Sequence, residues 1–189
     1  ADWAPNRFVE ANGVVSIEAA HFSRAVDNPP VSWKLLPDIG RTGAGMTIVP
    51  VTADRQTPGG DGPRLEYDVY LFSNVQQVNV AAYLSPRNNT RNRADGLRYA
   101  ISIDDGAPQA VEITKGIALY GNGNRVWERV TGDNVNITTT THTLSGAGAH
   151  VVKLWAVDPT IIVQKLVIDT GGLKPSYLGP PESYRTGAQ

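Results

Sequence analysis

Apolar and polar residues alternate with a period of two along much of this chain, which is the pattern of β-strands with one buried face. Apolar residues at helical spacing are nearly absent. The apolar runs are rich in Val, Ile, Thr and Tyr, which suit a pleated, half-buried surface. The pattern predicts nine strands, which are Gly13–Glu18, Gly45–Val51, Arg64–Phe72, Gln76–Leu84, Leu97–Ile103, Gln109–Ile113, Asn134–Leu144, His150–Val157 and Ile161–Ile168.

Polar clusters rich in glycine, proline and asparagine separate these runs and mark the turns. Asp104–Gly106 is the clearest hairpin turn, because an Asp-Gly pair favours the positive φ that a tight turn requires. Val151–Val157 is apolar on both faces and is therefore expected to be a central strand. The strand pattern predicts an all-β domain, a β-sandwich or jelly roll, over residues 1–189. The proline-rich segment from about Gly171 is expected to be an irregular tail.

Composition narrows the classes of partner. The chain has 189 residues, enough to bury a core without staples, and a formal net charge of -1. The absence of a basic surplus argues against a nucleic-acid partner. No apolar stretch reaches the roughly 18–20 residues that span a bilayer, so no membrane partner is expected. The lack of cysteine excludes disulfides, thiolate metal sites and a cysteine nucleophile.

Patterns of catalytic side chains are missing. No serine stands in a G-x-S-x-G motif. Asp104 and Asp105 are adjacent at a strand end and point to opposite sides, so they do not resemble the separated carboxylates of a glycosidase. His142 and His150 flank one turn without a third metal ligand and are interpreted as surface imidazoles. We therefore expect no catalytic site in this chain.

Two tryptophans near polar loops are the best candidates for ligand contact. Sugar rings stack their apolar C–H faces on aromatic rings, while amides and guanidinium groups bind the hydroxyls. Trp33 follows the loop-like stretch 28–32, and Trp127 follows the polar loop 121–124. The alternative is that each tryptophan caps the core at a strand end. The candidate ligand-binding residues are Trp33, Trp127, Tyr120, Asn28, Asn124, Arg125 and Arg41, the last as a clamp for a carboxylate.

Three segments resemble carbohydrate-binding module families 6 and 35. Gly13–Phe22 resembles their opening strand, Leu97–Gly106 resembles their central Ser-Ile-Asp-Gly hairpin, and His150–Pro159 resembles their last strand but one. The resemblance implies a β-sandwich that binds sugars.

A narrower resemblance is to the C-terminal domain of glycoside hydrolase family 115. Its residues are Phe8–Glu18, Asp158–Pro159 and the long, specific run Ile168–Ser183. That family comprises xylan α-1,2-glucuronidases, which remove (4-O-methyl-)glucuronic acid from xylan. The resemblance covers nearly the whole chain and implies a module of a larger bacterial enzyme, whose catalytic domain and polysaccharide substrate are its partners. It also implies a secreted, periplasmic or cell-surface location.

The module families further imply a structural calcium ion near the first strand. Glu18 and Asp169 stand where those families place two of the ligands. The second acidic residue of the opening signature is replaced here by Ala20, which removes one of the hard oxygen ligands that calcium prefers.

Two functions follow from these observations. The first is a non-catalytic module that binds plant cell-wall xylan, in particular glucuronoxylan or its uronic acid side groups. The alternative is a structural or dimerisation domain of a xylan α-glucuronidase without sugar affinity of its own. A free-standing enzyme has little support.

Overall fold

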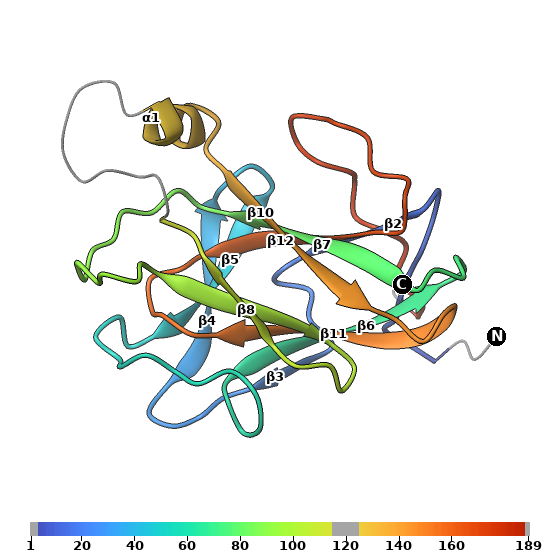
Figure 1. Ribbon diagram of the computed structural model, residues 1–189, viewed down its shortest axis with the longest axis horizontal. Coiled ribbons are helices and arrows are strands. Elements are labelled where there is room, and N and C mark those ends of the chain that lie inside the picture. Colours follow the sequence, from blue (N-terminus) through green and yellow to red (C-terminus); the bar gives the residue numbers. More distant parts are fainter. Residues whose placement is uncertain (1–3, 115–124, 188–189) are drawn as a thin grey trace.

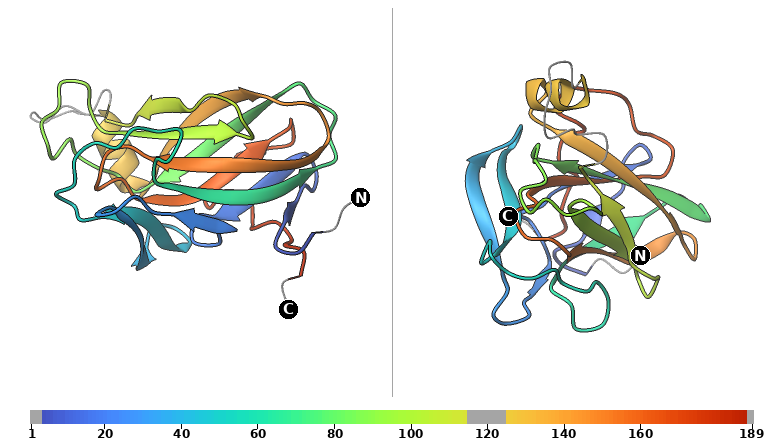
Figure 2. Two further views of the ribbon diagram at one scale, coloured as in Figure 1. Left: turned by 90° about the horizontal axis from the view of Figure 1, so that it is seen from below. Right: turned by 60° about the vertical axis from the view of Figure 1, so that its left-hand side comes forward.

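Two six-stranded sheets pack face to face in the computed structural model, which describes residues 4–114 and 125–187 (Figure 1). The first sheet, sheet A, contains β1 (Phe8–Val9), β3 (Arg24–Val26), β6 (Arg64–Leu71), β8 (Arg98–Ile103), β9 (Gln109–Glu112) and β11 (Gly148–Ala156). The second, sheet B, contains β2 (Val14–Glu18), β4 (Ser32–Ile39), β5 (Gly43–Val49), β7 (Gln77–Leu84), β10 (Asn136–Thr143) and β12 (Val163–Asp169). The two layers are seen edge-on in Figure 2, so the predicted all-β sandwich is confirmed.

The strands are ordered β1-β6-β11-β8-β9 in sheet A, with β3 also paired to β6. Sheet B is ordered β10-β7-β12-β5-β4, with β2 also paired to β12. The pairings are antiparallel except that of β1 with β6. β11 lies between β6 and β8, which confirms the central strand predicted from its two apolar faces.

All nine predicted strands are present, and the differences lie in short or edge elements. β4 was not predicted, because Lys34 and Pro37 interrupt its apolar pattern, and an edge strand tolerates both. The helix α1 (Arg125–Gly132) was also missed, since eight residues are too few for a clear helical period. The predicted hairpin turn between β8 and β9 is confirmed: the Gly106 N–H donates to the Ile103 carbonyl at 2.9 Å. The positive φ falls on Asp104, at 52°.

Inward-facing residues of both sheets form the core. Leu65, Tyr67 and Leu154 are fully buried there. The Tyr67 hydroxyl donates to the Ala19 carbonyl at 2.8 Å, and burial raises the pKa of that hydroxyl. Trp155 faces outward from β11 but is also buried, with its Nε1–H donating to Ser102 at 2.8 Å. No helix within the described ranges is long and apolar enough to cross a bilayer.

The outer face of sheet B is also apolar, and the C-terminal segment covers part of it. This outer cluster consists of Val14, Ala81, Tyr83, Val135 and Val167, against which Leu173 packs. Residues 170–184, called the arch below, leave the end of β12 and rise over this face without forming a regular element (Figure 1). Burial of these outer side chains thus depends partly on the proline-rich tail.

Glu10 joins the end of β6 to the start of the arch through hydrogen bonds. Its carboxylate is buried and accepts hydrogen bonds from the Phe72 and Ser73 N–H groups, at 2.5 and 2.8 Å. The hydroxyls of Ser73 and Thr170 also donate to it. Burial alone raises the pKa of Glu10, but these donors outweigh burial and hold it below its usual value.

We expect Glu10→Gln to lower the free energy of unfolding at pH 7 by about 2 kcal/mol. The NH2 group of the glutamine cannot accept a hydrogen bond, so some of the N–H and hydroxyl donors around the carboxylate lose their acceptor. The lowered pKa means that the unfolded chain takes up the proton first. The stability from Glu10 is therefore present above pH 4.5 and is lost as pH falls further. Urea denaturation at pH 7, 5 and 4 checks this. The variant should lose less stability than the wild type between pH 5 and 4, and an equal loss would contradict this role of Glu10.

Candidate functional site

The structure places two predicted ligand residues, Trp33 and Asn28, on adjoining segments, but not as a stacking platform. Trp33 lies in β4, and its partly buried ring packs against Val31 and Ile48. Asn28 is exposed in the β3–β4 turn and exchanges backbone hydrogen bonds with Val31, at 3.1 and 2.8 Å. Trp33 therefore packs partly against the core, and its role in ligand contact stays a prediction.

Arg41 lies in the β4–β5 turn and is committed to protein contacts. Its Nε donates to the Asp133 carbonyl at 2.6 Å, another of its nitrogens donates to the Tyr177 carbonyl, and its guanidinium stacks 3.9 Å from the Tyr177 ring centroid. Arg125 is exposed and Trp127 partly buried on α1, which Asp133 follows. Arg41 thus joins the arch to the segment after α1. Tyr120 and Asn124 lie outside the described residues.

The residues implied as calcium ligands do not fit one ion. Glu18 pairs with Lys165 and Asp169 with Val14 in the β2–β12 ladder. Four residues of strand therefore separate the two acids, about 13 Å at the rise of an extended chain. Glu18 is 3.1 Å from the Lys165 ammonium, and Asp169 Oδ1 accepts the N–H groups of residues 171–173. Both carboxylates thus serve as structural acceptors.

The interpretation of His142 and His150 as surface imidazoles is wrong, because both are buried. The ring of His142 contacts the Thr140 hydroxyl at 2.8 Å, and burial lowers its pKa. His150 contacts the Asp104 carboxylate at 2.7 Å. Within residues 4–114 and 125–187, no three His, Asp or Glu side chains are grouped so as to hold a metal ion.

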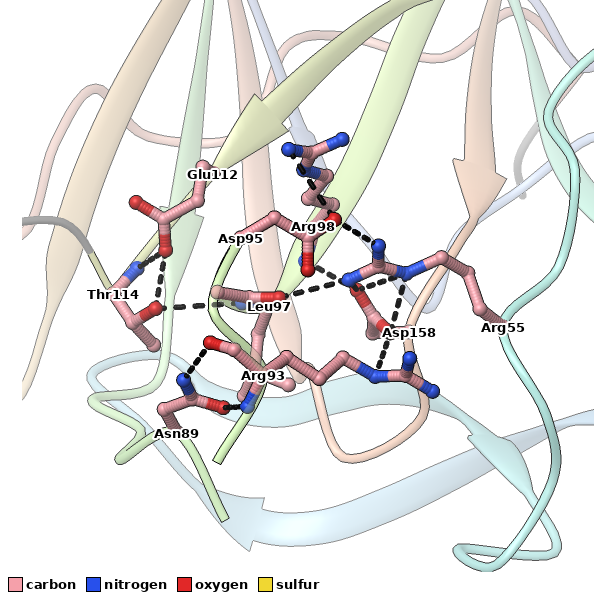
Figure 3. Close-up of polar contacts among 10 residues, drawn as sticks. Arg55, Asn89, Arg93, Asp95, Leu97, Arg98, Glu112, Thr114 and Asp158 are labelled. Atoms are coloured by element: carbon pink, nitrogen blue, oxygen red, sulfur yellow. Dashed lines mark hydrogen bonds and ion pairs between the residues drawn. The ribbon is translucent and has the colours of Figure 1, made fainter. Parts of the chain in front are cut away.

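A cluster of arginines that the sequence analysis did not select lies where three loops meet. We call this region the loop end; it comprises residues 50–63, 85–97 and 157–162, which connect β5 to β6, β7 to β8 and β11 to β12. Four arginines lie within or directly after the second loop, and Arg55 lies on the first. Figure 3 shows Arg55, Arg93 and Arg98. The signal in the sequence was the local arginine density of 87–98, which the overall charge of -1 conceals.

Asp158 is the centre of this cluster. Its side chain is fully buried, and Arg55 donates to it from Nε and Nη2 at 2.9 and 2.8 Å. The backbone N–H of Arg98 donates to the same carboxylate at 2.8 Å, and Arg93 Nε lies 3.3 Å away. Figure 3 shows Arg55 approaching Asp158 from the first loop, and Arg93 and Arg98 approaching it from the second. The bond to Asp158, followed by that to Asp95, raises the pKa of Arg55, so the guanidinium stays charged.

The β7–β8 loop is shaped by further contacts around this centre. The Gly96 carbonyl accepts from Arg55 at 2.8 Å, and Gly96 has a φ of 68°. A Cβ atom there would lie 2.0 Å from a Glu112 carboxylate oxygen, so only glycine fits. The Asn89 side chain bonds both the N–H and the carbonyl of Arg93, at 3.0 and 2.6 Å (Figure 3). The loop is therefore held in a defined conformation.

Several buried polar atoms at the loop end have no hydrogen-bond partner among the described residues. They are Arg87 Nε and Thr160 Oγ1, together with Nε1 of Trp33, which lines a small cavity with Asp158. Arg93 Nε also makes no hydrogen bond, but it lies 3.3 Å from the Asp158 carboxylate. Buried polar atoms are otherwise nearly always bonded, and each exception calls for an explanation. Thr160 also has a φ of 75°, which a β-branched residue rarely adopts. Unsatisfied donors and backbone strain gathered in one place are typical of a ligand-binding site.

A large hollow lies elsewhere, between the arch and the β1–β2 turn. It has a volume of about 990 Å³ and is lined mainly by the two legs of the arch, with Asn12 and Val14 on the opposite side. A second hollow, of about 440 Å³, lies between Arg41, Arg129 and Tyr177. The first hollow is lined largely by the tail, whereas the second is lined mainly by Arg41 and residues of 129–137, with only Ser176 and Tyr177 from the tail.

We expect Asp158→Asn to lower the free energy of unfolding by about 3 kcal/mol, because the variant leaves Arg55 without its buried counter-charge. Asp95→Asn is the matched control, since Asp95 contacts the same guanidinium but is 43% exposed, against 0% for Asp158. Urea denaturation at pH 7 should show a clearly smaller loss for the control. Equal losses would mean that Asp158 is not the centre of the cluster.

Calcium is expected to leave the melting temperature unchanged, because Glu18 and Asp169 cannot share an ion. An ion bound at a hundredfold excess over its dissociation constant would add about 2.7 kcal/mol of stability. Thermal unfolding with calcium and with a chelator distinguishes the two cases. A reproducible increase with calcium would show that other ligands in the chain hold the ion.

The chain was compared with protein families and with solved structures. The model of the glycosyl hydrolase family 115 C-terminal domain matches residues 7–182. No protein of curated function matches the chain. The fold is similar to part of BtGH115A, a family GH115 4-O-methyl-α-glucuronidase with specificity for decorated arabinogalactans. The TM-score is 0.58 at 18% identity, over 84% of this chain and 18% of that one.

Two further structures share the fold. The C-terminal CBM6 of the laminarinase LamC from Zobellia galactanivorans has a TM-score of 0.52 at 13% identity, over 82% of this chain and 98% of that module. The isomalto-dextranase of Arthrobacter globiformis T6 has a TM-score of 0.51 at 13% identity, over 85% and 24% of the two chains. Because the family model spans nearly the whole chain, the protein belongs to the glycosyl hydrolase family 115 C-terminal domain family.

Proposed function

We propose that this chain is a non-catalytic carbohydrate-binding module of a family-115 enzyme, and that its loop end binds glucuronoxylan through the uronic acid side groups. The observation that carries the proposal is the loop end itself, where buried polar atoms without partners lie among five arginines. A ligand with hydroxyls and a carboxylate supplies the missing acceptors. A fold shared with a CBM6 module supports a role in sugar binding.

The choice of a uronic acid follows from charge. Residues 50–63, 85–97 and 157–162 hold four arginines and four aspartates, so the loop end as a whole has no large surplus of charge. Arg55 and Arg93 contact Asp158, whereas Arg87 has no carboxylate partner among the described residues. A neutral sugar leaves that guanidinium without a counter-charge, whereas a uronate supplies one. The name of BtGH115A specifies a glucuronic acid derivative, which supports the same chemistry.

A role without catalysis follows from the carboxylates of the loop end. General acid catalysis needs a carboxyl group that holds a proton near neutral pH. The hydrogen bond from Arg55 instead lowers the pKa of Asp95, and Asp158 is enclosed by guanidinium groups. These groups suit binding of an anion. The polysaccharide target also implies a secreted, periplasmic or cell-surface enzyme.

The arch favours a second function, that of an accessory domain packed against the rest of the enzyme. Tyr177, Leu178 and Tyr184 are 61, 53 and 70% exposed on it. Arg41 holds its tip, and Lys165 donates to the Pro180 carbonyl at 2.8 Å on its returning leg. Large apolar side chains fixed in an exposed position are typical of a protein contact. A partner of this kind is the parent enzyme's catalytic domain, and the two functions use different surfaces.

We expect soluble glucuronoxylan to retard the protein in native affinity gels, and unsubstituted xylan to retard it less. In roughly 1 M salt the charged contribution should be screened, so that the two polysaccharides become similar. The double variant Tyr177→Ala/Leu178→Ala is the control, because the arch is not part of the loop end, and its retardation should match the wild type. If neither polysaccharide retards the wild type, sugar binding is excluded and the accessory function remains.

A further inference from the structure

Arg87 differs from the other arginines of the loop end. Arg55, Arg93 and Arg98 contact Asp95 or Asp158, and Arg91 donates to the Val51 carbonyl at 2.9 Å. Within the described residues, Arg87 has neither an ion pair nor a hydrogen bond, and its Nε is buried. Burial lowers the pKa of Arg87, since its desolvation is not offset by a carboxylate. A partly buried guanidinium without an acceptor is costly and is retained where an anion compensates it.

The strand register puts Arg87 and the strained Thr160 at matching positions just beyond the sheet. Leu84 of β7 pairs with Val163 of β12, and the Ser85 N–H donates to the Ile162 carbonyl at 3.0 Å, one residue beyond the strands. Arg87 and Thr160 each stand two residues beyond this last hydrogen bond between the two segments.

Thr160 combines an unsatisfied hydroxyl with a strained backbone. Its Oγ1 is buried without a partner in the described structure, although a hydroxyl both donates and accepts. Its φ of 75° is unfavourable for a β-branched residue, for which asparagine or glycine would be easier. The chain thus holds a strained hydroxyl and an unpaired guanidinium at the same exit from the sheet.

We propose that Arg87 and Thr160 form the subsite that binds the carboxylate of one uronosyl group. The guanidinium binds the two carboxylate oxygens through parallel N–H donors, and the hydroxyl donates to one of them. The other arginines hold the loops and do not select the charge of the ligand. This inference rests on the proposed function and adds the residues that distinguish a uronic acid from its neutral analogue.

The test compares two ligands by isothermal titration calorimetry. One is a xylo-oligosaccharide bearing a single 4-O-methylglucuronosyl group, and the other is the same compound with its carboxyl group reduced to an alcohol. We expect the wild type to bind the acid about tenfold more tightly, the effect of one charge-assisted bidentate contact. Arg87→Gln should remove this preference and leave the affinity for the reduced compound unchanged.

Two further variants separate binding from structure. Thr160→Val keeps the shape and the strain but removes the hydroxyl, and should weaken binding of the acid alone, by about threefold to tenfold. Arg91→Gln changes the same charge in the same loop and should keep the full preference for the acid. Without ligand, Arg87→Gln should melt at the same temperature as the wild type or higher, because it removes an unpaired, partly buried charge.

The outcomes distinguish the subsite from the function on which it rests. Equal affinity of the wild type for the acid and the reduced compound would overturn the subsite and leave sugar binding intact. No binding of either compound would overturn both. If Arg87→Gln weakens both ligands equally or lowers the melting temperature, Arg87 has a structural role and the subsite is excluded.

Discussion

The buried carboxylate of Asp158 is the charge on which the loop end depends. Removing a carboxylate from water costs several kcal/mol unless charged donors surround it. Here the compensating donors come from two other loops, through Arg55 on the first and through Arg93 and the backbone of Arg98 on the second. Because Asp158 itself lies on the third loop, satisfying this one carboxylate fixes three loops relative to one another. The surface formed by these loops is therefore rigid although it contains little regular structure.

Strand patterning predicted the fold well because burial in a sandwich has a simple signature. Each central strand buries alternate residues in the core, and β11, with two apolar faces, was recognised as central. The pattern failed where burial is partial. β4 is an edge strand with exposed residues at half its positions, and α1 buries only Val130 among its described side chains. Neither element carries a periodic signal strong enough to separate it from a loop.

The candidate site was harder to predict, because its residues become a site only through long-range contacts. Arg55 and Asp158 are 103 positions apart in the sequence, and neither stands in a motif. Trp33 was selected because tryptophan is a frequent sugar platform, but the residue type does not reveal whether its face is exposed. Arg41 was selected for a carboxylate, and the carbonyls of Asp133 and Tyr177 occupy its donors instead. The density of arginines in 87–98 was the one local signal.

The two ends of the sandwich differ in how completely their polar groups are satisfied, and this difference bears on function. At the end that carries Glu10, every hydrogen bond to the carboxylate comes from a fixed neighbour, and the result is an anchor for the tail. At the loop end, Asp158 is equally well satisfied, yet Arg87 Nε and Thr160 Oγ1 have no hydrogen-bond partner among the described residues. The loops supply several donors to the buried carboxylate of Asp158 but no carboxylate to the partly buried guanidinium of Arg87. The strain and the unpaired donors that persist at this end are therefore the observations on which the proposed carboxylate subsite rests.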